Sequence, residues 1–199
     1  MLESYLLSRP WLVAAIWAVL YASDYYLTIW GAKLREAQDV LATEGSYELN
    51  PFFQKDVDRK RLVGRAFLIW LILGAVVLVG AGYLVDEPRK AYGFIAGMFV
   101  LPHLCVLRRH VSNIVLLKEV LRPESGVSGH LKVKRHVAHR ECGYELGMYA
   151  FTAIVLFAVT DSYILLGGAF MLALMSRRQF IYSKRAKLKP TPVPQDTAD

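Results

Sequence analysis

The stretch from Ala66 to Val85 constrains this chain most, because twenty consecutive residues carry no Asp, Glu, Lys or Arg. About 20 apolar residues are needed to cross the roughly 30 Å hydrocarbon core of a bilayer. A helix of this composition has no polar face to present to water. The stretch therefore predicts a membrane-spanning helix. A content of 55% apolar residues and a mean hydropathy of +0.32 extend that expectation to the whole chain.

Four further stretches are apolar enough to span a membrane. The predicted spans are 11–31, 66–85, 91–107, 143–160 and 162–176. The last two come from one apolar run that is too long for a single helix and contains Asp161 and Ser162, residue types that favour helix starts. We therefore predict an all-α fold, a polytopic membrane helix bundle of about five transmembrane helices with cytosolic helical extensions. Residues 1–189 form one transmembrane domain, and the polar, Pro-rich residues 190–199 form a disordered tail.

The 24 Lys and Arg residues alternate between the two sides of these spans. Seven lie in residues 32–65, eight in 108–142 and six after the last span, whereas the other connections and the N-terminus hold three in total. Because positive residues are retained on the cytosolic side, we expect a multipass protein of the cell (inner) membrane with its N-terminus outside and its C-terminus cytosolic. The same residues suit anionic headgroups on the cytosolic face. A membrane-protein partner or a homo-oligomer also remains open, and no nucleic-acid partner is expected.

Asp24 is the acid inside the first predicted span. A carboxylate near the centre of a membrane helix costs about 2.5–3.5 kcal/mol on insertion, so we expect Asp24 to face the interior of the bundle. Thr28 lies one turn further along the same face. Two interpretations remain open. The carboxyl is either a proton site, cation site or catalytic acid, or it joins neighbouring helices by a hydrogen bond.

The motif Glu-Leu-Asn-Pro at residues 48–51 precedes the second predicted span. Asn before Pro is typical of a helix start, which explains Asn50 but leaves Glu48 as a second candidate catalytic residue beside Asp24. Together with Asp-Tyr-Tyr-Leu-Thr at 24–28, the motif resembles an uncharacterised family of small multipass membrane proteins. That family has an Asp-x3-Thr element in the first span and a Glu-x-Asn-Pro element before the second. The resemblance covers residues 20–53 and implies no activity.

Polar residues also accumulate near the end of the third predicted span. His103 and His110 are seven residues apart and share one helix face, and Asn113 lies on the same side as His110. They either form a metal or proton-relay face or bond to a neighbouring helix. Arg108 and Arg109 either anchor the helix at the membrane surface or hold the phosphate of an anionic headgroup.

A second group of potential ligands precedes the fourth predicted span. His136, His139 and Cys142 follow a three-residue spacing that places them on one side of a helix, and zinc accepts such ligands. The spacing matches no standard zinc motif, and the surrounding basic residues favour a segment that lies on anionic headgroups. A divalent metal such as Zn, Mn or Fe is therefore one of two alternatives, and no other cofactor is indicated.

Three functions fit these observations. The first is a cytosol-facing Asp/Glu/His site, with or without a metal, that acts on a lipid headgroup or another membrane-surface substrate. The second is a non-catalytic membrane subunit or scaffold whose polar residues fix helix packing. The third is a proton- or cation-linked carrier built on Asp24. Convergence of Asp24 and Glu48 with His103 or His110 around a cavity would favour the first.

Overall fold

The computed structural model describes residues 2–36, 41–43, 50, 52–85, 88–120, 122 and 131–188. Its helices are α1 (Leu2–Leu7), α2 (Pro10–Glu36), α3 (Gln54–Asp58), α4 (Arg65–Leu84), the π-helical turn η1 (Pro88–Tyr92), α5 (Gly93–Val120), α6 (Arg135–Thr160) and α7 (Tyr163–Leu188). The predicted all-α helical bundle is confirmed. Glu48 and the predicted tail, residues 190–199, lie outside the described residues.

Five of these helices, α2, α4, α5, α6 and α7, are long and apolar enough to cross a membrane. Large apolar side chains on them face outward rather than into the bundle, and on α4 they occur on almost every turn. Exposure of so large an apolar surface to water would be unfavourable, whereas contact with lipid tails is favourable. These helices make the chain a multipass membrane protein.

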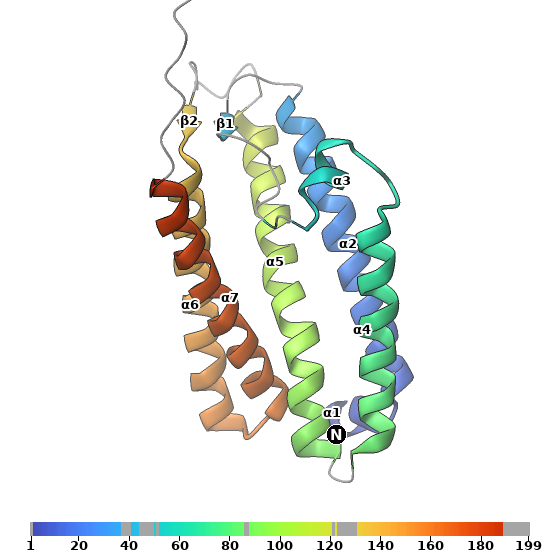
Figure 1. The fold of residues 1–199 in the computed structure, drawn as a ribbon. Helices are drawn as coiled ribbons and strands as arrows, with labels where there is room; N and C mark the ends of the chain where they lie inside the picture. Colours follow the sequence, from blue (N-terminus) through green and yellow to red (C-terminus); the bar gives the residue numbers. More distant parts are fainter. Residues whose placement is uncertain are drawn as a thin grey trace, which may run out of the picture.

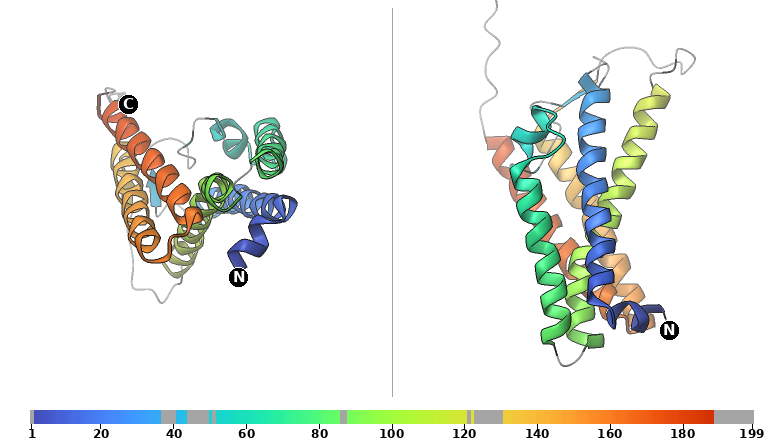
Figure 2. Two further views of the ribbon diagram at one scale, coloured as in Figure 1. Left: turned by 90° about the horizontal axis from the view of Figure 1, so that it is seen from below. Right: turned by 90° about the vertical axis from the view of Figure 1, so that its right-hand side faces the viewer.

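The five long helices pack in the order α4, α2, α5, α7, α6. Figure 1 shows α5 in the middle, with α2 and α4 on one side and α6 and α7 on the other, and Figure 2 shows the same division from below. The N-terminus, the α4–η1 connection and the α6–α7 turn lie at one end, hereafter the turn end. The opposite end, where α2, α5 and α7 finish and α4 and α6 begin, carries most of the basic residues and is called the basic end.

Exposed tryptophans on α2 mark the depth of the membrane. The side chains of Trp11 and Trp30 are 55% and 43% exposed, and tryptophan favours the boundary between lipid tails and headgroups. At 1.5 Å per residue they lie about 28 Å apart, close to the roughly 30 Å hydrocarbon thickness. Asp24 is therefore about 9 Å along the helix from the boundary at the basic end.

Glycines bring α5 and α7 into backbone contact near the turn end. A Cβ atom added at Gly97 would lie 2.0 Å from the carbonyl oxygen of Ile164, and one added at Gly167 would lie 1.8 Å from that of Phe94. Small residues drive helix association in lipid because they let the backbones approach closely. The Gly-x3-Gly spacing at residues 93–97 is the sequence signal of this contact, although it was not among the predicted features.

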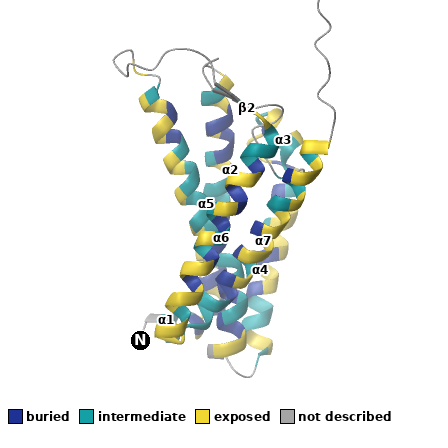
Figure 3. Ribbon diagram, turned by 90° about the vertical axis from the view of Figure 1, so that its left-hand side faces the viewer, coloured by how far each residue is buried: buried dark blue, intermediate teal, exposed yellow. Residues whose placement is uncertain are grey.

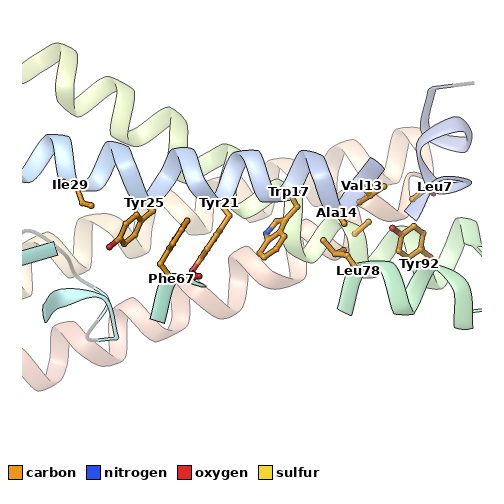
Figure 4. Close-up of a cluster of buried hydrophobic side chains, with 11 residues drawn as sticks. Leu7, Val13, Ala14, Trp17, Tyr21, Tyr25, Ile29, Phe67, Leu78 and Tyr92 are labelled. Carbon is orange, nitrogen blue, oxygen red and sulfur yellow. Dashed lines mark hydrogen bonds between the residues drawn. The ribbon is translucent and has the colours of Figure 1, made fainter. Parts of the chain in front are cut away.

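Stacked aromatic rings join α2 to α4 (Figure 4). The ring of Phe67 on α4 lies between Tyr21 and Tyr25 of α2, with centroid distances of 5.3 Å and 4.4 Å. The Tyr25 hydroxyl donates a hydrogen bond of 2.7 Å to the carbonyl oxygen of Arg61, just before α4. This column fixes the start of α4 beside the half of α2 that carries Asp24.

Burial follows the packing order. Buried positions face neighbouring helices and exposed positions face outward (Figure 3). One buried cluster joins α1, α2, α4, η1 and α5, and a second joins α6 and α7 with partly buried residues of α5. Because α5 contributes to both, it holds the two halves of the bundle together.

Several local predictions differ from the structure. Asp161 does not begin a helix; it is the left-handed C-cap of α6, with φ of 53°, and the first carbonyl acceptor of α7 belongs to Ser162. Asn50 accepts a hydrogen bond from the backbone N–H of Phe52 and forms a turn, while α4 begins only at Arg65. The parallel pairing of β1 (Leu41–Thr43) with β2 (Leu131–Val133) was not predicted, because three-residue strands have no recognisable pattern.

Candidate functional site

Asp24 of α2 and His110 of α5 form a hydrogen-bonded pair between the helices. Asp24 Oδ1 lies 2.9 Å from His110 Nε2, and the hydroxyl oxygen of Thr28 lies 3.2 Å from the same nitrogen. Thr28 is almost fully buried, and the side chains of Asp24 and His110 are 25% and 15% exposed. Three residues predicted from sequence to be polar-site candidates therefore meet at one point.

The hydrogen-bond pattern identifies which imidazole nitrogen carries the hydrogen. The Thr28 hydroxyl donates to the backbone carbonyl oxygen of Asp24 at 2.8 Å, so its oxygen is left to accept from His110. A carboxylate also only accepts. Nε2 is therefore the donor to both groups. Nδ1 of His110 is buried and has no hydrogen-bond partner within the described part of the chain.

A small cavity borders Asp24, between α2 and the segment that includes α3. Its volume is about 30 Å³. The residues that line it are Tyr21, Asp24, Tyr25, Thr28, Phe53 and Val57. A space of this size accommodates a water molecule but not a lipid headgroup. Asp24 thus contacts the cavity and His110 at once, which is the arrangement needed to pass a proton between them.

The other residues predicted near this site have different surroundings. His103 donates a hydrogen bond through Nδ1 to the carbonyl oxygen of Phe99 at 2.6 Å, and its ring packs against Trp17 and Tyr21. It faces α2, as His110 does, but lies two turns closer to the turn end. Asn113 is half-buried and makes no hydrogen bond to another described residue. The position of Glu48 relative to Asp24 stays a prediction.

Arg108 and Arg109 pair with acids of α6. Arg108 Nη1 lies 3.0 Å from Glu145 Oε1 and also contacts the Tyr149 hydroxyl. Arg109 lies 3.1 Å from Glu141 and 3.3 Å from Glu145. The guanidinium of each arginine thus already has carboxylate partners, and their role toward an external phosphate stays a prediction.

Glu141, Glu145 and Tyr149 were not among the residues predicted from sequence. Glu145 interrupts an otherwise apolar stretch, and a buried carboxylate in lipid needs a cationic partner. Arg108 and Arg109, which directly follow the neighbouring predicted span, were the sequence signal that such a cationic partner exists. Which helices face one another, however, is not readable from either helix alone.

His136, His139 and Cys142 do not assemble into a metal site. His139 Nδ1 lies 2.6 Å from Gln179 Oε1 of α7, whereas His136 contributes its backbone carbonyl to the Ser183 hydroxyl at 2.7 Å. Cys142 is buried beside Arg109. Among the described residues, no group of three or more His, Cys, Asp or Glu side chains is placed to hold a metal ion.

These contacts instead form a polar seam between α6 and α7. A third hydrogen bond runs from the Ser176 hydroxyl to the carbonyl oxygen of Gly143 at 2.7 Å. In lipid, serine, glutamine and histidine join helices in this way. The seam explains why α6 and α7 form a single packed hairpin.

No known protein family matches this chain, and no curated protein or solved structure matches it either. Its class, a multipass membrane protein, therefore rests on the five apolar helices. Any activity has to be inferred from the chemistry of the Asp24–His110 pair.

Proposed function

We propose that the Asp24–His110 pair acts as a general acid–base site that promotes attack of water on a membrane-surface substrate, with a phospholipid headgroup ester as the substrate class. The observation that carries the proposal is that Asp24 both lines a water-sized cavity and accepts a hydrogen bond from His110 Nε2–H. A polar group within a span is a functional candidate because its insertion is costly.

In this proposal Asp24 takes one proton from a water molecule in the cavity, and the water oxygen forms a new bond to the phosphorus atom. The bond from phosphorus to the leaving alcohol breaks, and Asp24 returns the proton to that alcohol oxygen. His110 holds the carboxylate in position through Nε2–H, and Thr28 holds the imidazole. The substrate approaches from the basic end, where the boundary lies about 9 Å from Asp24 along α2, and its headgroup stays outside the water-sized cavity.

The activity is tested with purified full-length protein in vesicles of mixed phosphatidylglycerol, phosphatidylethanolamine and phosphatidylcholine. Headgroup release is followed by mass spectrometry. We expect wild-type protein to release a water-soluble product and Asp24→Asn and His110→Gln each to lower the rate by about 10²-fold or more. His103→Gln is the matched control, because it removes a histidine from the same helix face. Absence of product, or equal rates in wild-type and Asp24→Asn protein, would contradict the proposal.

A second candidate function is a non-catalytic membrane subunit in which the pair only fixes helix packing. One observation favours it: Asp24, Thr28 and His110 join α2 to α5 by side-chain hydrogen bonds. Interhelical hydrogen bonds of this kind stabilise membrane proteins by about 0.6 kcal/mol on average. The two functions differ in whether water reaches Asp24 in the folded protein.

A further inference from the structure

The apolar parts of α6 and α7 are too short to cross a bilayer of ordinary thickness. On α7, 14 residues separate Tyr163 at the turn end from Arg177, which corresponds to about 21 Å. On α6, 15 residues separate Thr160 from Glu145, or about 22 Å. The hydrocarbon core is about 30 Å thick, and any tilt of the helices shortens the distance they cover.

The opposite side of the bundle does not share this shortfall. The uncharged part of α4, from Ala66 to Leu84, extends about 27 Å. The turn ends of α4 and of the α6–α7 hairpin lie at the same end of the molecule (Figure 1). Counted from that end, the first charged groups on the hairpin therefore lie about 6 Å closer to the turn end than the first charged group on α4. A short apolar segment is accommodated by local thinning of the bilayer and by arginine side chains that reach for the headgroups.

Three arginines occupy this level of the hairpin. The seam hydrogen bonds pair Ser176 with residue 143 and Gln179 with residue 139, so Arg140 lies within a turn of Arg177 and Arg178 along the axis. All three are exposed. Within the described residues, Arg140 and Arg177 have no ion pair, and the guanidinium of Arg178 lies over the rings of Tyr182 and Phe52 and donates a hydrogen bond to the Tyr182 hydroxyl.

The charges around these arginines favour an anionic headgroup over a zwitterionic one. The two nearest acids on α6, Glu141 and Glu145, are neutralised by Arg108 and Arg109. Among the described residues, no further carboxylate lies at this level of the hairpin. The cationic group of a zwitterionic headgroup would therefore have no anionic partner there. Guanidinium groups bind phosphate through paired hydrogen bonds.

We propose that the α6–α7 hairpin at the level of Arg140, Arg177 and Arg178 is a binding site for anionic phospholipid. Local thinning of the leaflet at the basic end brings the lipid phosphate to this level. The site is separate from Asp24 and His110 and does not depend on the function proposed for them.

The binding test uses full-length protein in a non-ionic detergent, titrated with phosphatidylglycerol and followed by native mass spectrometry. We expect the double variant Arg177→Gln/Arg178→Gln to bind phosphatidylglycerol at least about tenfold more weakly than wild-type protein. The variant Lys55→Gln/Arg59→Gln is the matched control, because it removes two exposed positive charges at the opposite side of the basic end.

We expect the control to stay within about twofold of wild-type protein, and glycerol phosphate at the same concentration not to displace the lipid. Equal losses in the two double variants would show general charge attraction and overturn the proposal. Displacement by glycerol phosphate would also overturn it, because the ligand would then be a free phosphate.

The thinning is tested separately with two spin-labelled cysteine variants, Leu174→Cys on α7 and Leu73→Cys on α4. Both leucines are exposed, at 43% and 47%, and each lies 11 residues from the turn end of its helix. We expect the label at 174 to lie closer to the headgroups of the basic end by several ångströms, as measured by relaxation agents in phosphatidylglycerol bilayers. Equal depths for the two labels would refute the thinning.

Discussion

Replacing Gly97 by alanine would separate α5 from α7, and the size of the effect follows from the geometry. The added Cβ would lie 2.0 Å from the carbonyl oxygen of Ile164, so the helices would have to move apart by about 1 Å to reach even the shortest normal contact. The neighbouring atom belongs to a backbone and cannot rotate away as a side chain can. Overpacking of this kind costs about 1–3 kcal/mol, and the higher helix propensity of alanine returns up to about 1 kcal/mol.

A net loss of about 1 kcal/mol, the middle of the resulting range, corresponds to a Tm lower by about 2–4 °C for a protein of this length. The assay is thermal unfolding of full-length protein in detergent, followed by size-exclusion chromatography of a fluorescent fusion. Gly80→Ala is the matched control, because no atom lies within 4 Å of a Cβ added at that position on α4. We expect Gly80→Ala to leave the Tm unchanged or raise it. If the two variants shift the Tm equally, the backbone contact between α5 and α7 does not stabilise the bundle.

Three further variants probe the remaining contacts by the same thermal assay. Ser176→Ala removes the hydrogen bond to a carbonyl of α6 and should cost about 0.6 kcal/mol; a cost of zero would argue against the polar seam. Arg109→Gln leaves two carboxylates of α6 without this partner and should cost about 1–3 kcal/mol, whereas Arg122→Gln, in an exposed pair, should cost at most about 1 kcal/mol. If Arg122→Gln costs as much as Arg109→Gln, the partial burial of Arg109 does not strengthen its ion pairs with α6. Tyr25→Phe removes the hydrogen bond before α4 and should cost about 0.5–1.5 kcal/mol, and an unchanged Tm would show that ring stacking alone positions α4.

The fold was predictable because membrane insertion depends on properties of each segment alone. Length and apolar composition identified all five spanning helices, and the charged residues beyond them continue the helices rather than end them. The short elements were not predictable. The strands β1 and β2 consist of three residues each and pair across almost 90 residues of sequence, so no local pattern indicates them.

The candidate site was predictable in part, for the same physical reason. The cost of placing Asp24 in a span indicated an interior position, and the helical repeat placed Thr28 beside it. Their partner was harder to identify, because His103 and His110 lie on one face of α5 and only the relative tilt and height of α2 and α5 decides which of them meets Asp24. The structure brings His110 to the carboxylate and packs His103 among aromatic rings.

The pairing of Arg108 and Arg109 with Glu141 and Glu145 shows the same limit. Each helix on its own leaves charged groups that need partners, and several cross-helix pairings would satisfy them. Packing of α6 against α7 through the seam at Ser176 sets the rotation of α6, and this rotation presents its acids to α5.

The central claim is that water exchanges protons with Asp24 in the folded protein, and a hydrophobic carbodiimide tests it most directly because the reagent modifies protonated carboxyl groups in membranes. Glu145 is the internal control, since its side chain is 22% exposed, close to the 25% of Asp24, but lies between two arginines. Mass spectrometry of the treated full-length protein should find Asp24 modified and Glu145 unmodified, because Asp24 lines the water-sized cavity whereas both carboxylate oxygens of Glu145 are paired with arginines. An unmodified Asp24, or equal modification of the two carboxyls, would contradict the account and leave the pair as a packing contact.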